Sequence, residues 1–322
     1  MKYLTSILTL ILVLLLTAGL AGCDSTGTEP EQEPMPAPLN LVEVNSLHNH
    51  DTGEHLFELS TNEIPSGWAT FRLINQSHAD HFILLSKVPD GIGLEDYRTE
   101  VVHVIQNFLD SILENDLSFP EAGFEFPDWY AETQFMGGPG LTAPQRTSQA
   151  TMELTPGTYI LECYIKSADG TQWHHMLGML AELTVTEEVS PAEAPEHTVA
   201  MTLRNPENGG LDVGEDISSG EHTLAVDFAE QQVYSTGAQN DVHLARLSDD
   251  TDLGALGAWM NALDPAGFIS PGAPAEFVGG IEDMPAGTTA YFTVELTPGR
   301  YAWIAEVPDP AAKGMLRTFT VE

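Results

Sequence analysis

The sequence predicts an all-β protein of two tandem antiparallel β-sandwiches, each with a helical insertion. Short runs rich in β-branched and aromatic residues are separated by Gly/Pro turns, a pattern typical of sandwiches. Between residues 94 and 114, apolar residues recur instead at helical spacing. Two long segments of the chain share motifs, which indicates two copies of one domain.

Length and charge limit the classes of partner. A chain of 322 residues is long enough for two domains that each bury a core. It carries 48 Asp and Glu against 11 Lys and Arg, a net charge of -37. This charge repels phosphate backbones, so we expect no nucleic-acid partner. The surface suits a salt-rich medium or a cationic partner.

The first 22 residues are typical of a bacterial lipoprotein signal peptide. Lys2 precedes the apolar run Ile7–Leu16, and Leu20–Cys23 resembles a lipobox, which implies lipid attachment to Cys23 after cleavage. The alternative is a transmembrane anchor, but the apolar run is short for a bilayer. Residues 23–39 have the acidic, Pro-rich composition of a tether. We therefore expect a cell-envelope protein, periplasmic or on the outer-membrane surface, that touches the membrane only through its lipid.

The repeat sets the domain boundaries. Two motifs recur with the same separation in both copies: ELTPGTY at Glu153–Tyr159 returns as ELTPGRY at Glu295–Tyr301, and FMGG at Phe135–Gly138 returns as FVGG at Phe277–Gly280. The sequence between the copies, EEVSPAEAPEH, has the composition of a linker. We predict domain one at 40–188, a linker at 189–197 and domain two at 198–322.

Within domain one, strands are predicted at 69–74, 82–85, 159–166 and 180–185. The helical spacing predicts a helix at 94–114, which domain two keeps in shorter form at 253–263.

Cys163 is an unpaired thiol if Cys23 is lipidated. Strand alternation places it on the core face. Asp169-Gly170 predicts a hairpin turn that pairs Lys166 with Trp173, Ile165 with His174 and Cys163 with Met176. The turn returns His174 to the face of Cys163, close enough to share an ion. The alternative is a Cys163 that acts only as a small buried hydrophobe.

At these residues the sequence resembles the cupredoxins, the plastocyanin-like blue copper proteins. Thr155–Tyr159, Cys163, His174 and the pair Gly178-Met179 resemble the C-terminal end of that family, and His81 follows a strand like the one that leads to its first histidine ligand. The resemblance implies that each copy is a Greek-key sandwich of cupredoxin-like type.

The resemblance also implies a type 1-like copper site in domain one. His81 and His174 would be the imidazole ligands, Cys163 the thiolate and Met179 the weak axial ligand. Such a set suits both oxidation states of copper, which implies electron transfer or copper handling with a redox partner protein. We expect the His81 imidazole to lie within about 4 Å of the Cys163 sulfur, as ligands of one ion must.

The sequence departs from the family in two ways. Ten residues separate Cys163 from His174, and strand alternation makes Met176 a rival to Met179 as the axial ligand. In domain two, Ala305 stands at the Cys163 position and only His243 and Met315 persist, so we expect this copy to be degenerate.

Three weaker candidates remain. His48, His50 and His55 could form a separate Zn²⁺ or Cu²⁺ site or an exposed group. Asp249–Asp252 partly resembles a calcium loop but lacks its bidentate Glu, which favours a solvated turn. Trp173, Met176 and Leu177 could form a docking patch or pack in the core.

No catalytic motif is found: the sequence has no Gly-x-Ser-x-Gly, no His-Glu-x-x-His, no phosphate loop and no paired His-x-His clusters. We therefore expect no enzymatic activity. The alternative to a copper protein is a metal-free extracellular binding or scaffold module.

Overall fold

A computed structural model describes residues 40–49, 52–115, 125–213, 217–234, 237–262 and 264–322. The expected signal peptide, the tether and Cys23 lie outside the described residues. No helix in this part of the chain is both long and apolar enough to span a membrane.

The first half of the chain folds into eight described strands. They are β1 (Leu41–His48), β2 (His55–Leu59), β3 (Glu63–Asn75), β4 (Leu84–Val88), β5 (Gln134–Phe135), β6 (Thr147–Leu154), β7 (Gly157–Glu162) and β8 (Leu180–Val189).

Strand β3 belongs to both layers of a sandwich. Its second part pairs with β1 in parallel and with β6 antiparallel, while β2 pairs with β1. Its first residues pair with β8 in parallel, and β8, β7, β4 and β5 continue as an antiparallel layer. Because β3 has 13 residues, it is long enough to pair with strands of both layers.

The second half repeats the arrangement. Its strands are β9 (Val199–Leu203), β10 (Leu211–Val213), β11 (Gly220–Phe228), β12 (Val242–Leu247), β13 (Glu276–Ile281), β14 (Thr288–Leu296), β15 (Gly299–Ile304) and β16 (Leu316–Val321). Strand β11 pairs with β9 in parallel and with β14 antiparallel, as β3 pairs with β1 and β6. Strand β12 lies between β13 and β15, as β4 lies between β5 and β7.

The duplicated ELTPG motif forms the same turn twice. The Tyr159 hydroxyl donates to the Thr155 carbonyl at 2.7 Å, and the Tyr301 hydroxyl donates to the Thr297 carbonyl at 2.9 Å. Because both motifs make the same contact between equivalent strands, the repeat seen in the sequence is also a repeat in the fold.

The two halves share a sheet and a core. Strand β14 pairs with β6 through three residues, which joins the halves into one twelve-stranded sheet. Residues 137–143 also run along β13, with bridges from Pro139 to Ile281 and from Thr142 to Val278. One apolar core contains residues of both halves, among them Phe71, Leu161, Phe292 and Trp303. Both halves lie in one compact unit, so the domain boundaries at 188 and 198 stay a prediction.

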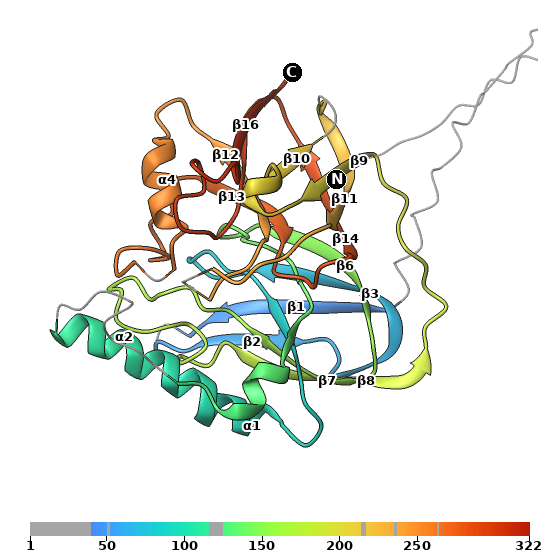
Figure 1. The fold of residues 1–322 in the computed structure, drawn as a ribbon, viewed down its shortest axis with the longest axis vertical. Helices are drawn as coiled ribbons and strands as arrows, with labels where there is room; N and C mark the ends of the chain where they lie inside the picture. Colours follow the sequence, from blue (N-terminus) through green and yellow to red (C-terminus); the bar gives the residue numbers. More distant parts are fainter. Residues whose placement is uncertain (1–39, 50–51, 116–124, 214–216, 235–236, 263) are drawn as a thin grey trace, which may run out of the picture. The chain divides into compact units, whose positions relative to one another are not determined.

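The helix expected at 94–114 is confirmed. It consists of α1 (Leu94–Tyr97), a π-helical turn η1 (Arg98–Val102) and α2 (His103–Asn115), and it lies along the outer face of the first half (Figure 1). Tyr97 and Val101 pack against Ile160 and Leu180 of β7 and β8. Short 3-10 turns occur as η2 (Asp128–Glu132) and η3 (Pro206–Asn208).

In the second half, α4 (Leu253–Trp259) begins where the shorter helix was expected. The Asp252 carboxylate accepts from the Gly254 and Ala255 amides at 2.8 and 3.2 Å. The acidic turn at Asp249–Asp252 therefore caps the N-terminus of α4.

Candidate metal centre

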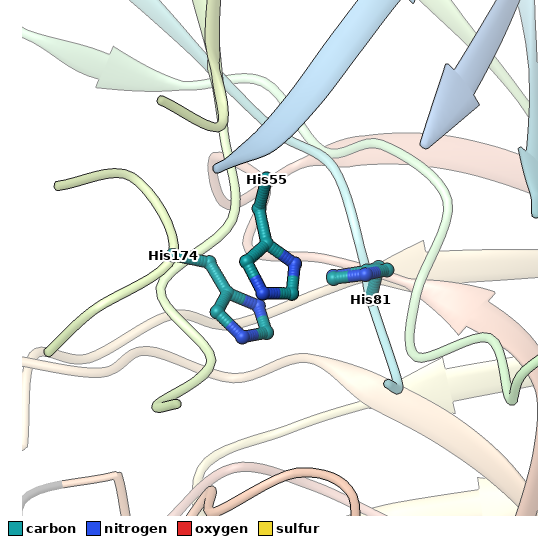
Figure 2. Close-up of side chains that lie close together, drawn as sticks. All are labelled: His55, His81 and His174. Carbon is teal, nitrogen blue, oxygen red and sulfur yellow. The ribbon is translucent and has the colours of Figure 1, made fainter. Parts of the chain in front are cut away.

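Three imidazoles from distant segments meet inside the first half. His55 begins β2, His81 lies between β3 and β4, and His174 lies on the hairpin that follows β7. All three are buried, and one ring nitrogen of each lies within 4.8 Å of the others. Figure 2 shows their rings turned toward one another.

The Cys163 thiol lies beside one member of this group, His81. Its sulfur is fully buried and lies 3.6 Å from His81 Nδ1, which is within the distance expected of two ligands of one ion. Strand β7 ends at Glu162, earlier than the predicted 166, and the Cys163 amide donates to the Met179 carbonyl at 3.3 Å, in register with the preceding pair of Glu162 and Leu180. Of the sequence-predicted residues, His81 thus lies beside both Cys163 and His174.

The predicted hairpin places His174. Lys166 forms an antiparallel bridge with Trp173, and the His174 amide donates to the Ile165 carbonyl at 2.8 Å. Helix α2 supports the turn, since the Gln106 side chain donates to the Thr171 carbonyl and accepts from the Trp173 amide.

The predicted pairing of Cys163 with Met176 is wrong. The chain turns after His174 and brings Met179 opposite Cys163, whereas Met176 is 36% exposed. Met179 is fully buried in the apolar cluster that contains Cys163. Of the two rival axial groups, Met179 therefore lies in the core with the thiol. Trp173 is buried as well, which removes it from an exposed docking patch.

His55 is the member of this centre that sequence reasoning placed elsewhere. The His55 ring stacks on the His174 ring with centroids 4.0 Å apart, and the two are 119 residues distant in the chain. His48 pairs with His55 across the β1–β2 hairpin, with His48 Nδ1 3.0 Å from His55 Nε2. His50 lies outside the described residues. The sequence feature that could have drawn attention to His55 is the hairpin between His48 and His55, because it sets the two imidazole rings side by side.

Some ring nitrogens of the three histidines have a hydrogen-bond partner and others have none. His81 Nε2 lies 2.7 Å from the Ser77 hydroxyl. Both ring nitrogens of His174 are buried without a hydrogen-bond partner, and so is His55 Nδ1. Leaving a buried polar atom unpaired costs about 1–3 kcal/mol. Since buried polar groups are almost always paired, these nitrogens indicate a group that the protein chain itself does not supply.

Burial also sets the protonation of these side chains. It lowers the pKa of His81 and of His174 well below the usual value, and neighbouring histidines add to the effect. Burial, with His48 and His78, lowers the pKa of His55 to about 4. Burial raises the pKa of the Cys163 thiol to about 12. The imidazoles are therefore neutral at neutral pH and keep lone pairs for a cation.

These donors fit a soft or borderline metal ion. Neutral imidazole and thiol groups bind copper or zinc, whereas Mg²⁺ and Ca²⁺ prefer oxygen ligands. His55, His81, His174 and Cys163 could hold such an ion.

Comparisons with known proteins give matches among solved structures only. No family model matches the sequence, and no curated protein matches it. Reduced auracyanin from Roseiflexus castenholzii is 18% identical over 47% of this chain and 99% of its own, with a TM-score of 0.26. Auracyanin A from Chloroflexus aurantiacus, described as a blue copper protein, is 19% identical over 45% of this chain and 98% of its own, with a TM-score of 0.26.

Longer matches cover both halves. A multicopper oxidase is 13% identical over 88% of each chain, with a TM-score of 0.22. A copper-containing nitrite reductase from Thermus scotoductus is 12% identical over 88% of this chain and 61% of its own, with a TM-score of 0.21. The strand pairing of β1, β3 and β6, which β9, β11 and β14 repeat in the second half, carries the fold assignment. The fold is of cupredoxin-like type and occurs in two copies.

The expectation that the chain is not an enzyme is corrected. Enzymes, namely oxidases and a nitrite reductase, are among the structures that match this cupredoxin-like chain. The expectation rested on the absence of familiar motifs, which does not exclude redox chemistry.

The second cupredoxin-like copy keeps the backbone of the centre without its thiol. Ala305 occupies the position of Cys163, and its amide donates to the Met315 carbonyl at 3.0 Å, as the Cys163 amide donates to Met179. The expected match of His243 with His81 is wrong: His243 pairs with Ile304 of β15 as Leu84 pairs with Glu162 of β7, so the buried His243 stands at the position of Leu84. The degeneracy expected from the sequence therefore concerns side chains, whereas the fold at this point is retained.

Proposed function

We propose that this protein binds one copper ion between His55, His81, His174 and Cys163 and uses it to transfer single electrons. The observation that carries the proposal is His174, whose two buried ring nitrogens have no hydrogen-bond partner although the His55 and His81 rings lie beside it. A cation would take up these lone pairs and replace the thiol proton.

The donor chemistry supports copper rather than a hard cation. A thiolate with imidazoles stabilises both Cu⁺ and Cu²⁺, and a weak thioether such as Met179 tunes the potential. Burial excludes water and keeps the ligands in one geometry as the charge of the ion changes.

Copper handling is the second candidate, and the histidines outside the centre favour it. The His48 ring contacts His55, and the His78 ring meets His48 at 4.4 Å between centroids. His78 is exposed, whereas His55 is buried. Imidazoles therefore extend from the surface to the buried centre, as a path for loading or releasing an ion would require.

The N-terminal sequence supports a location for this activity. The lipobox-like residues Leu20–Cys23 support lipid attachment at Cys23, and the tether at 23–39 would hold the protein body away from the membrane. In this proposal the protein is anchored in the cell envelope and exchanges electrons or copper with a partner protein there.

Copper titration of the whole mature chain tests the proposal. One equivalent of Cu²⁺ should produce an intense visible thiolate-to-copper absorption band and a higher melting temperature. Cys163→Ser should abolish the band, His174→Ala should weaken binding, and His55→Ala should shift the band. His103→Ala, at an exposed histidine of α2, is the matched control and should behave as the wild type.

The outcome also separates the candidate functions. Copper retained through cycles of reduction and oxidation supports electron transfer, whereas release on reduction supports copper handling. A colourless mixture with no change in melting temperature would contradict both and would leave the metal-free binding module.

A further inference from the structure

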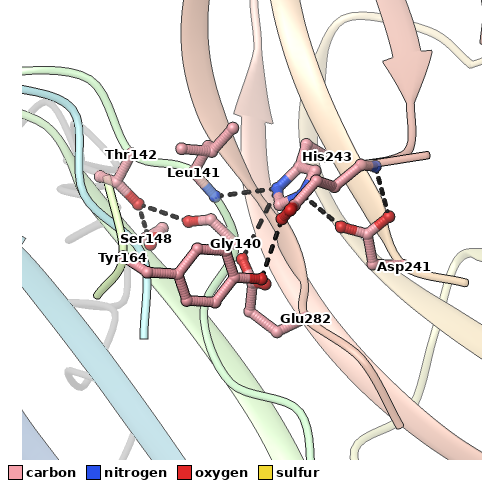
Figure 3. A network of polar contacts seen from close by, with 9 residues as sticks. Gly140, Leu141, Thr142, Ser148, Tyr164, Asp241, His243 and Glu282 are labelled. Atoms are coloured by element: carbon pink, nitrogen blue, oxygen red, sulfur yellow. Dashed lines mark hydrogen bonds and ion pairs between the residues drawn. The ribbon is translucent and has the colours of Figure 1, made fainter. Parts of the chain in front are cut away.

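The second half contains a buried polar group of its own, of different chemistry. Asp241, His243 and Glu282 are at most 1% exposed, and one potential ligand atom of each lies within 4.8 Å of the others. They lie at the start of β12 and just after β13, beside the segment of the first half that contains Leu141 (Figure 3).

The Glu282 carboxylate is the unusual member of the group. It is fully buried, and neither of its oxygens has a hydrogen-bond partner. Its Oε1 lies 3.8 Å from His243 Nδ1. A proton would neutralise the carboxylate but would leave a buried hydroxyl with no acceptor, so protonation alone does not satisfy the group.

The His243 imidazole is held in a defined orientation. Its Nε2 donates to Asp241 Oδ2 at 2.6 Å, and Asp241 Oδ1 accepts from the Glu306 amide at 2.7 Å. Nδ1 therefore carries the lone pair of the ring, which accepts from the Leu141 amide at 3.0 Å, and Glu282 Oε1 lies 3.8 Å from the same nitrogen. A carboxylate on the far nitrogen of an imidazole is the arrangement that orients histidine ligands in metal sites.

Further acidic groups increase the local negative charge. Asp283 and Glu306 are each 5% exposed, and Glu306 accepts from the Tyr164 hydroxyl at 2.9 Å. Asp241, Asp283 and Glu306 thus all lie close enough to Glu282 to act on it electrostatically. Burying unpaired charge is costly, and a divalent cation would offset that cost at this position.

We propose that Glu282 and His243 bind a divalent cation of the Zn²⁺ class, with Asp241 holding the imidazole. A mixed imidazole and carboxylate set suits Zn²⁺, whereas Ca²⁺ needs six or more oxygen ligands. The cation takes the Nδ1 lone pair in place of the Leu141 amide. Leu141 belongs to the first half and His243 to the second, so this ion acts where the halves meet.

Zn²⁺ titration tests the proposal on the whole mature chain freed of metals. The first centre can also bind zinc, so the parent protein for this test is the double variant Cys163→Ser/His174→Ala. The parent should bind one Zn²⁺ by calorimetry and gain melting temperature, and Ca²⁺ at the same concentration should have no effect. Adding Glu282→Gln should abolish both the binding and the gain.

Two comparisons keep the result interpretable. Without zinc, the Glu282→Gln protein should melt at or above the temperature of its parent, because a buried unpaired carboxylate is gone; this shows that the variant folds. Glu295→Gln, at an exposed position of β14, should keep the response to zinc. Absence of bound Zn²⁺ in the parent, or a zinc response that survives Glu282→Gln, would overturn the proposal. Because the parent lacks the first centre, this outcome is independent of copper binding.

Discussion

Single residues decide how the donors of the candidate copper centre are presented. The Ser77 hydroxyl lies 2.7 Å from His81 Nε2 and 2.9 Å from Asn75 Oδ1, so it holds the imidazole from one side. The other nitrogen, Nδ1, then faces the Cys163 sulfur. One hydroxyl thus selects the nitrogen that a metal ion would meet.

Ser77→Ala should weaken copper binding without removing any ligand. Loss of such an orienting partner typically lowers metal affinity about 10–100-fold. Competition with a chelator measures the affinity, and Ser219→Ala, at an exposed serine, serves as the control. Equal affinity in both variants would show that Ser77 does not orient His81.

At the scale of the elements, the repeated Phe-x-Gly-Gly motif shapes the strand edges beside both polar groups. Gly138 has φ 137°, and a Cβ there would lie 1.9 Å from the Ile83 carbonyl oxygen. Gly280 has φ 144°, and a Cβ there would lie 2.1 Å from the Val242 carbonyl oxygen. Both glycines permit a close backbone approach at equivalent residues, Ile83 in the first half and Val242 in the second, which explains why the motif occurs in both copies.

Gly138→Ala should destabilise the protein more than Gly287→Ala. Both glycines have positive φ, but a Cβ at Gly287 would meet nothing within 4 Å. The difference between the variants therefore isolates the backbone contact, which should cost an additional ~1–3 kcal/mol of unfolding free energy. Urea denaturation measures this difference, and equal losses would count against a tight approach at Gly138.

At the scale of the whole molecule, Lys166 ties the ligand hairpin to the second half. Its Nζ donates to the Asp264 and Gly267 carbonyls at 2.6 and 2.9 Å, and its backbone pairs with Phe268 and Ser270. Burial lowers the pKa of Lys166 to about 7, and the attraction of Asp264 and Glu306 opposes this only in part. A buried amine at the contact between halves makes their association sensitive to pH.

The free energy of unfolding should rise with pH between about 7 and 10.5 because of Lys166. In this window the unfolded chain keeps a proton that the folded protein has lost, and the slope is positive when the unfolded state binds more protons. Below pH 7 both states are protonated and the contribution is constant. The slope from one such group is at most about 1.4 kcal/mol per pH unit.

Denaturation of Lys166→Met across this range should show a shallower slope than the wild type. Lys87→Met, at a partly exposed lysine of β4, should keep the wild-type slope. Parallel curves for the wild type and Lys166→Met would rule out Lys166 as the source of the pH dependence.

Local patterns of the sequence determined much of this molecule. The repeat, the helix at 94–114 and the hairpin at Asp169-Gly170 all follow from spacing and turn residues within a short stretch of chain. That hairpin was enough to place His174 near Cys163, because a two-residue turn sets the register of the pairs that follow it. His81 joined them through a family resemblance rather than a local pattern.

Only the tertiary structure decided which distant side chains share one site. His55 stacks on His174 because the β1–β2 hairpin ends beside the turn at Gly178, and Glu282 faces His243 because β13 pairs with β12. The side chain of Met176 is exposed because the chain turns at 174–178, which strand alternation does not predict. Contacts between residues far apart in sequence depend on how sheets pair and bend, and that depends on packing across the whole core rather than on any single segment.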